Sequence, residues 1–384
     1  MKKLIIILAA ICLFFSSAAA EKKFSLQADI SAVPDPALIS LDLYDMGDGF
    51  YAETSLLPDK ALFFGCSDES VTEDFSFLYL PAGLFRTALT DTETTIIEWI
   101  SRRSNAEVYT GFYTGDLFRQ ATNKISTSFT AAELADFLHL QATDLTAKNG
   151  VGESPANISR LIMSYLGIWL QSIPDWQDMI VHADLYDQAK YVSISFIRDE
   201  QAVICVSADL SSGNSRKIVT VTRTQNSYYF TGINIQCNDD RIDFRTSVYS
   251  SASQSYRNAT SGIPFITIDL NVVSAENNKN DLTLSFIPAN TAHPLLVKGS
   301  IEQDNIHLKA SVEENTEFSL ELFAKAEETN HIDFSGKELI DLTDAGKSEG
   351  VAFEIMANFL PVLSQILQAV PSDYQEILTK LITF

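Results

Sequence analysis

The sequence predicts an α+β protein in which antiparallel meander sheets, curved or half-barrel-like, are followed by separate blocks of apolar helices. Long stretches alternate apolar and polar residues with a period of two, which is typical of antiparallel strands with one dry face. Apolar residues at helical spacing gather in two blocks, and each block follows a run of strands. Segregated blocks of this kind favour α+β architecture over a doubly wound parallel sheet.

Residues 1–20 have the pattern of a secretory signal peptide. Two lysines precede an apolar run from Leu4 to Phe15, and small residues follow up to Ala20. This run is shorter than the about 20 apolar residues that a membrane-spanning helix needs. We therefore expect cleavage near Ala20, an extracytoplasmic location (periplasmic or secreted), and no stable membrane anchor.

The part of the chain that follows the leader, residues 21–174, is expected to form a smaller antiparallel sheet followed by helices. The candidate strands are 24–30, 38–43, 50–56, 61–66 and 75–80.

Capping signals mark the helices that come after these strands. Asp91 is a candidate cap for the first of them. Thr130 and Glu133 have the spacing of a capping box, and Ser154 followed by Pro155 is a typical helix start.

Residues 175–384 are expected to form a larger meander, from about 179 to 334, followed by C-terminal helices. Its alternation is clearest at 266–272, where isoleucine, leucine and valine occupy every second position. The C-terminal block is interrupted by Pro361, which is expected to kink or split it, and Ser372 begins a last helix. The pattern leaves open whether the two parts pack as one unit.

The charge balance excludes some partners. The chain carries 27 basic and 50 acidic residues, a formal net charge of −23. Such a charge repels phosphate backbones and anionic lipid head groups, so we expect no nucleic-acid partner.

The sequence contains no pattern that indicates a reaction. The five histidines include no pair at helical spacing for zinc, and there is no nucleophile elbow, Walker loop or dinucleotide fingerprint. The sequence therefore predicts no catalytic, cofactor or metal residue; it leaves an enzymatic function open and favours a non-enzyme. Cys205 and Cys237 lie in strand-like segments and are either a candidate disulfide pair or buried free thiols.

One aromatic run is a candidate contact site. Alternation places Tyr228 and Phe230 on the same face as Asn234 and Gln236, which is otherwise polar. Aromatic side chains among amides are suited to stacking on a ligand or a partner protein, or they lie beneath another part of the fold.

Two functions fit this description. The first is a soluble extracytoplasmic protein that binds an apolar ligand, such as a lipid, in a curved sheet covered by helices. The alternative is an envelope scaffold or protein-interaction module without a small-molecule ligand. In either case Leu134 and Phe359 are expected to face the core, so that Leu134→Asp or Phe359→Asp destabilises the fold.

Overall fold

The structure is a computed structural model. It describes residues 22–30, 37–45, 49–65, 80–103, 124–142, 154–224, 227–252, 260–275, 279–289, 291, 293–302, 304–312, 319–328, 334–369 and 374. The leader, most of the strand expected at 75–80 and the helix expected after Ser372 lie outside these residues.

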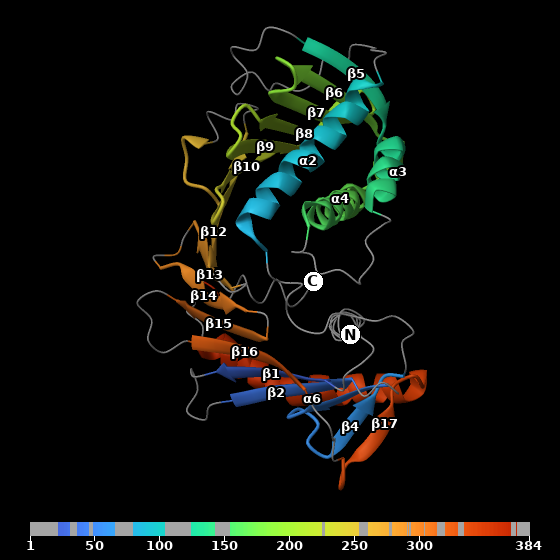
Figure 1. Ribbon diagram of the computed structural model, residues 1–384, viewed down its shortest axis with the longest axis vertical. Helices are drawn as coiled ribbons and strands as arrows, with labels where there is room; N and C mark the ends of the chain where they lie inside the picture. Colours follow the sequence, from blue (N-terminus) through green and yellow to red (C-terminus); the bar gives the residue numbers. More distant parts are fainter. Residues whose placement is uncertain are drawn as a thin grey trace.

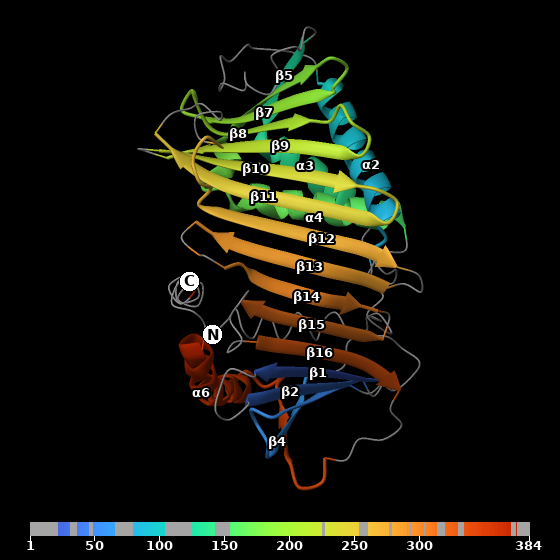
Figure 2. The same ribbon diagram turned by 90° about the vertical axis from the view of Figure 1, so that its left-hand side faces the viewer.

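All 17 described strands belong to one sheet (Figures 1 and 2). Their spatial order is β5-β6-β7-β8-β9-β10-β11-β12-β13-β14-β15-β16-β1-β2-β3-β4-β17, and every pairing is antiparallel except that of β17 with β4. The strands are Lys22–Ile30 (β1), Ala37–Asp45 (β2), Phe50–Thr54 (β3), Lys60–Phe63 (β4), Lys124–Thr130 (β5), Ile180–Tyr186 (β6), Tyr191–Arg198 (β7), Gln201–Asp209 (β8), Ser215–Arg223 (β9), Tyr228–Cys237 (β10), Arg241–Ser251 (β11), Ile266–Ala275 (β12), Lys279–Pro288 (β13), Leu295–Ile301 (β14), Asn305–Val312 (β15), Ser319–Glu328 (β16) and Glu338–Asp341 (β17).

The predicted α+β fold with separate meander sheets is wrong. One large open sheet dominates the described chain, and the helix blocks are minor additions to it. The physical reason is that the two meanders share hydrogen-bonding edges. β1 pairs with β2 on one side and with β16 on the other, so Phe24 lies opposite both Leu43 and Ala326.

The other join lies at the division expected near residue 174. There β5, from the first part, pairs with β6, from the second. The sheet is therefore continuous across that division.

Four α-helices and one short 3-10 helix are described. They are α2 (Ala82–Ser101), α3 (Ala131–Ala142), α4 (Pro155–Ser172), η3 (Trp176–Asp178) and α6 (Ala345–Ala369). The Thr130 backbone N–H donates to Glu133 at 2.8 Å, and the Glu133 N–H donates to the Thr130 hydroxyl, which confirms the capping box. Ser154 caps α4 through the Asn157 N–H, and Pro361 lies inside an uninterrupted α6.

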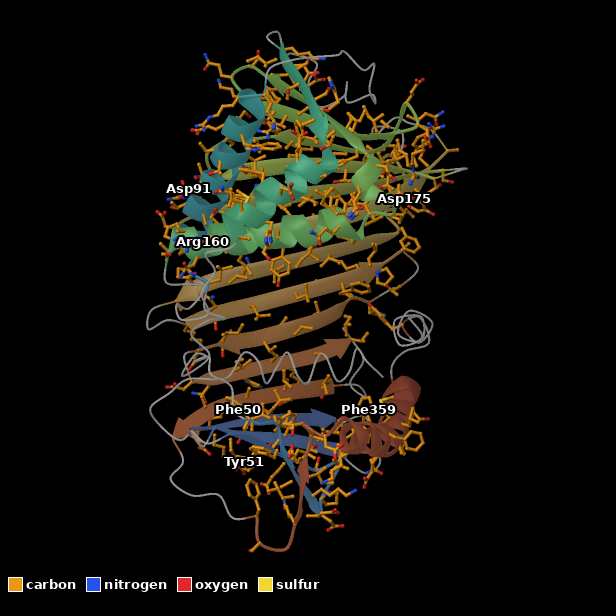
Figure 3. The ribbon with its side chains drawn as sticks, turned by 90° about the vertical axis from the view of Figure 1, so that its right-hand side faces the viewer. Phe50, Tyr51, Asp91, Arg160, Asp175 and Phe359 are labelled. Carbon is orange, nitrogen blue, oxygen red and sulfur yellow. The ribbon has the colours of Figure 1, made fainter. Side chains whose placement is uncertain are left out.

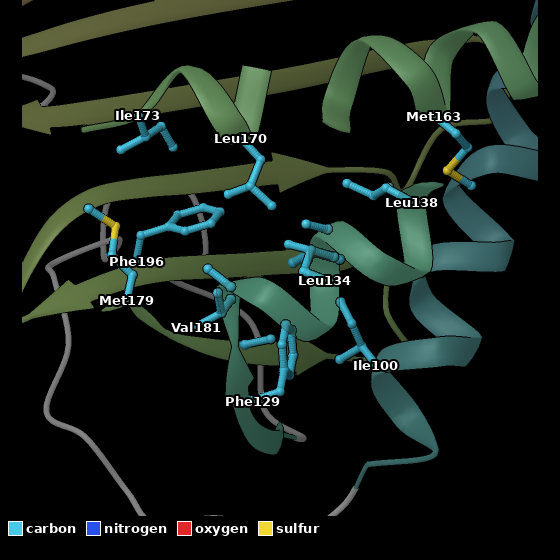
Figure 4. Packing of buried hydrophobic residues seen from close by; sticks show 14 of the residues in the cluster. Ile100, Phe129, Leu134, Leu138, Met163, Leu170, Ile173, Met179, Val181 and Phe196 are labelled. Atoms are coloured by element: carbon cyan, nitrogen blue, oxygen red, sulfur yellow. The ribbon is translucent and has the colours of Figure 1, made fainter. Parts of the chain in front are cut away.

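Strand alternation divides the sheet into an inner face, which the helices cover in part, and an outer face. At one end α2, α3 and α4 pack on the inner face of β5–β8 and bury Phe129, Leu134, Val181 and Phe196 in one cluster (Figure 4). A second cluster forms where α2 crosses β10–β12. At the opposite end α6 packs on β2–β4 and β16, where Val351 lies among the buried residues.

The sheet bends around these helices, so that the inner face is concave in the view of Figure 1. Gly299 marks a close approach between β14 and β15. A Cβ at this position would lie 1.8 Å from the His307 carbonyl oxygen, so only glycine fits without a backbone shift.

Candidate apolar binding face

A continuous apolar surface occupies the middle of the inner face, between the two helix-covered ends. We call it the central apolar face. Its side chains come from β12 to β16, all are half-buried, and none belongs to a hydrophobic cluster of the helix-covered ends. They are Ile266, Ile268, Leu270, Leu282, Leu284, Phe286, Leu295, Val297, Leu308, Ala310, Leu320 and Leu322.

The register explains why this surface is continuous. Leu284 lies opposite Leu270 on one side and Val297 on the other, and Leu308 lies opposite Leu322. Each strand therefore presents its apolar positions in step with its neighbours. Figure 3 shows the described helices lying over the two ends of this side of the sheet.

The dimensions suit an elongated ligand. The five strands β12–β16 are separated by four gaps, which at about 4.8 Å each make a span of about 19 Å across the strands. A bilayer hydrocarbon core of about 30 Å holds two acyl chains end to end, so one chain extends about 15 Å. The central apolar face therefore matches the length of one acyl chain.

Polar groups lie at the end of this face that adjoins α2. Asn280 precedes Leu282 by two residues on β13 and lies opposite Ser274, so both project from the inner face. The Ser274 hydroxyl accepts from the Ala82 N–H at 3.0 Å, which ties the start of α2 to β12. The Asn280 Nδ2 donates to the Leu80 carbonyl oxygen at 3.2 Å.

The Asn280 side-chain oxygen is unusual. Asn280 is 2% exposed, and its Oδ1 has no hydrogen-bond partner within the described part of the chain. Reversing the amide would not remove the problem, because Oδ1 would then face the Leu80 carbonyl oxygen and both atoms only accept. An unpaired buried acceptor costs about 1–3 kcal/mol, so this position weakens the fold locally.

A buried tyrosine marks the opposite end of β13. The Tyr374 hydroxyl donates to the His293 carbonyl oxygen at 2.7 Å and lies 3.3 Å from that of Phe286. Tyr374 therefore lies against the end of β13 at the middle of the sheet. Along β13, the central apolar face thus lies between Asn280 at one end of the strand and Tyr374 at the other end.

An ion pair holds α2 over the helix-covered end of the sheet. Arg216 of β9 is buried, and its Nε lies 2.6 Å and 2.8 Å from the two Glu93 carboxylate oxygens. Burial raises the pKa of the Glu93 carboxyl, and the Arg216 guanidinium only partly offsets this. Removing Arg216 would leave a buried carboxylate without its partner.

The outer face near the β5 edge carries a buried polar network centred on Asp184. The His182 ring lies between Ser128 and Asp184, with its Nδ1 3.0 Å from the Ser128 hydroxyl and its Nε2 3.1 Å from the carboxylate. Ser126 donates to the same carboxylate at 2.6 Å, and the Lys124 ammonium lies 2.9 Å away. Burial would raise the pKa of Asp184, but these donors outweigh it and lower the pKa to about 2.

This network contains a serine, a histidine and an aspartate in the order of a hydrolase triad. Its geometry favours a structural role, because His182 is 3% exposed and Asp184 also binds Ser126 and Lys124. A nucleophilic serine needs a neighbouring space for the substrate carbonyl, whereas this ring is enclosed. We therefore assign the network to the stability of the β5–β6 pair.

Two adjoining shallow hollows, of about 450 and 440 Å³, lie on the outer face of β10–β13 and share Asn234 and Arg245. Their charged groups are paired with each other: the Arg245 Nη2 lies 2.7 Å from Asp269, and the Asn271 amide donates to Asp243. The hollows therefore offer little unpaired charge to a ligand.

The residues that sequence reasoning singled out lie elsewhere. Phe230 is fully buried on the outer face, where it packs with Tyr228, Val221 and Tyr249, so the aromatic pair is not an open stacking platform. Tyr229, on the other side of the strand, is the exposed member of the run.

Cys205 and Cys237 are both free thiols and both buried. Alternation places Cys205 on the outer face and Cys237 on the inner face, so they do not form the candidate disulfide. Burial raises the pKa of the Cys237 thiol to about 11, which keeps it protonated and unreactive at neutral pH.

No group of three or more His, Cys, Asp or Glu side chains among the described residues is placed to hold a metal ion. No described helix is long and apolar enough to cross a membrane.

Comparison of the chain with protein-family models, curated proteins and solved structures finds no match.

Proposed function

We propose that the protein is an extracytoplasmic carrier that binds an apolar ligand, such as a lipid, on the central apolar face. One observation carries the proposal. A concave surface of aliphatic side chains lies between two helix-covered ends, and its half-buried residues belong to none of the buried clusters beneath the described helices. Apolar area gains about 25 cal/mol for each Å² removed from water, so a ligand that completes this burial binds favourably.

The composition of the face favours a lipid over a protein partner. Protein interfaces derive most of their binding energy from tryptophan, tyrosine and arginine. The central apolar face has none of these; its members are aliphatic apart from Phe286. A lipid tail needs only close-packed aliphatic contacts, which such a face supplies.

Charge and the N-terminal pattern support a carrier in solution. The net charge of −23 disfavours adsorption on anionic membranes, so the apolar face is suited to holding a ligand away from a bilayer. The leader-like pattern at 1–20 supports a location outside the cytoplasm.

The first test is native mass spectrometry of the protein purified without detergent from a secreting host. We expect bound mass that disappears on denaturation and extracts into organic solvent. In parallel, the environment-sensitive dye N-phenyl-1-naphthylamine should gain fluorescence on the protein and be displaced by long-chain lipids.

Two variants on neighbouring positions of β13 locate the binding surface. Leu284→Glu places a charge on the central apolar face, and Ser285→Glu places the same charge on the opposite face. Only Leu284→Glu should abolish dye binding and co-purified mass. Equal behaviour of the two variants, or a wild-type protein that carries no extra mass and binds no dye, contradicts the proposal.

A further inference from the structure

We infer that the outer face of β10–β13 binds a neutral saccharide chain across its two adjoining hollows. This site goes beyond the proposed function, because it lies on the opposite side of the sheet from the central apolar face. Three features of the hollows carry it: a floor of small side chains, a balance of charge, and a polar wall that faces an apolar one.

A row of small side chains forms the floor of the first hollow. Gly232 of β10 lies opposite Ser247 of β11, which lies opposite Thr267 of β12, and all three line the hollow of about 450 Å³. A glycine inside a strand weakens it and often marks the close approach of a ligand. The backbone of Gly232 is not left-handed, so its conformation does not require a glycine. The missing side chain at this position therefore deepens the hollow.

The charged groups around the hollows balance each other. The Arg245 Nη2 lies 2.7 Å from Asp269, and the Arg241 Nη2 lies 2.8 Å from Asp243. These two positive and two negative side chains leave no formal charge, whereas the whole chain carries −23. An anionic ligand would therefore meet no unpaired cation here, and a cationic ligand would meet no unpaired carboxylate. The ligand that matches this balance is neutral.

Unpaired neutral groups lie between these ion pairs. Asn234 and Gln236 are exposed on the outer face of β10, and neither side-chain amide has a partner in the described part of the chain. Each amide supplies two N–H donors and one carbonyl acceptor, and the Thr283 hydroxyl, which also lines the second hollow, both donates and accepts. A sugar hydroxyl likewise donates and accepts, so it can pair with each of these groups.

The first hollow also has an apolar wall. Tyr249 and Arg245 lie two residues to either side of Ser247 on β11, so they flank the small floor from opposite sides. Ile263, which is 80% exposed, and Pro264 also line this hollow. A sugar ring has an apolar face of C–H groups and a rim of hydroxyl groups, so one ring contacts both kinds of wall at once.

The size of the site favours a chain of sugars over a single ring. The hollows of about 450 and 440 Å³ each fall within the about 300–1,000 Å³ of small-molecule sites. They share Asn234 and Arg245 and are therefore continuous. From Gly232 to Gln236 the strand advances about 14 Å, at about 3.4 Å a residue, so consecutive rings can occupy the two hollows.

The test is isothermal titration calorimetry of the wild-type protein with maltohexaose, cellohexaose and chitin hexamer, which are neutral, and with glucose. We expect at least one hexamer to bind, and glucose to bind at least about ten times more weakly because it fills one hollow only. Asn234→Leu should weaken hexamer binding about five-fold, the factor that one net hydrogen bond contributes. Gly232→Val fills the floor and should weaken it at least about ten-fold. Its unfolding midpoint in urea should not fall, because valine is favoured in strands.

Asn305→Leu is the matched control, since Asn305 is exposed on the outer face of β15 and lines neither hollow. It should keep the wild-type affinity. Failure of all three hexamers to bind the wild-type protein at millimolar concentration, as expected of a merely solvated sheet face, overturns the inference. Equal affinities of Asn234→Leu and Asn305→Leu overturn it as well, and so does tighter binding of an anionic hexamer of galacturonic acid.

Discussion

At the scale of single residues, buried polar groups divide into satisfied and unsatisfied ones. Asp184 accepts from His182 and Ser126 and lies beside Lys124, whereas Asn280 keeps an oxygen without a partner in the described chain. The difference has opposite consequences. The Asp184 network stabilises the fold, whereas the unpaired oxygen of Asn280 costs it about 1–3 kcal/mol.

The Asp184 network makes stability depend on pH. A carboxyl whose pKa is about 2 in the folded state and about 3.9 in the unfolded chain contributes about 2 kcal/mol of stability above pH 4. Because the folded pKa is the lower one, this contribution is lost as the pH falls from about 4 to about 2. Urea unfolding should show wild type and Asp184→Asn differing at pH 7 and converging toward pH 2.

Asp240→Asn, at an exposed turn, is the control for this experiment and should follow the wild type at every pH. A gap between wild type and Asp184→Asn that stays constant from pH 7 to pH 2 would show that the lowered pKa of Asp184 is not the source of the difference.

A substitution at Gly299 should also destabilise the fold. A Cβ there would lie within bonding distance of the His307 carbonyl oxygen, so Gly299→Ala should lower the free energy of unfolding by more than about 2 kcal/mol. Gly213 is the control, because a Cβ added there would meet no atom of the described chain within 4 Å. Similar unfolding midpoints for Gly299→Ala and Gly213→Ala would contradict the close approach.

At the scale of elements, local signals identified most strands and several helix starts. The apolar alternation of Ile266, Ile268 and Leu270 indicated β12, and Thr130 with Glu133 indicated the start of α3. The prediction that α2 starts at Asp91 is wrong, because the helix begins nine residues earlier, directly after Pro81. No side chain forms a capping hydrogen bond at this start. A helix without a side-chain cap leaves no capping pattern to find.

Helix α3 supplies a prediction about packing. Leu134 is 8% exposed within the cluster that also holds Phe129, so Leu134→Asp should lower the free energy of unfolding by more than about 3 kcal/mol. Leu140 on the same helix is 68% exposed, and Leu140→Asp should cost less than about 1 kcal/mol. Phe359→Asp should fall between the two, because Phe359 is only half-buried (labelled in Figure 3). Chemical denaturation of the three variants measures this order, and equal losses at Leu134 and Leu140 would show that the helix faces are wrong.

At the scale of the whole molecule, the sequence contained the strands but not the pairing that joins them. Nothing local in Phe24 or Ala326 indicates that these residues lie side by side, since this contact depends on the whole chain between them. The central apolar face was missed for the same reason. Alternation showed which side chains share a face, whereas the part of that face that the described helices leave uncovered depends on where those helices lie.

The middle of the sheet, which the described helices leave uncovered, should also be its least stable part. β6 and β7 contribute Val181, Ala183 and Phe196 to a helix-covered cluster, whereas the apolar side chains that β13 and β14 place on the inner face are only half-buried. Hydrogen exchange followed by mass spectrometry should therefore show faster amide exchange for peptides from 279–301 than for peptides from 181–206. Adding 1-dodecanol should slow exchange in the first region alone. Uniform protection across both regions would contradict this view of the sheet.

The pairing of β1 with β16 has a consequence for how the protein is made. A chain that leaves the ribosome N-terminus first releases β1 early, but its partner β16 emerges only after β2 to β15 have been synthesised. Until then one edge of β1 has no partner, and the α6 end of the sheet cannot be completed. A product that stops before residue 319 would present open edges at both β1 and β15, and open edges of this kind template aggregation. The last strands of the meander therefore decide whether the first one remains soluble.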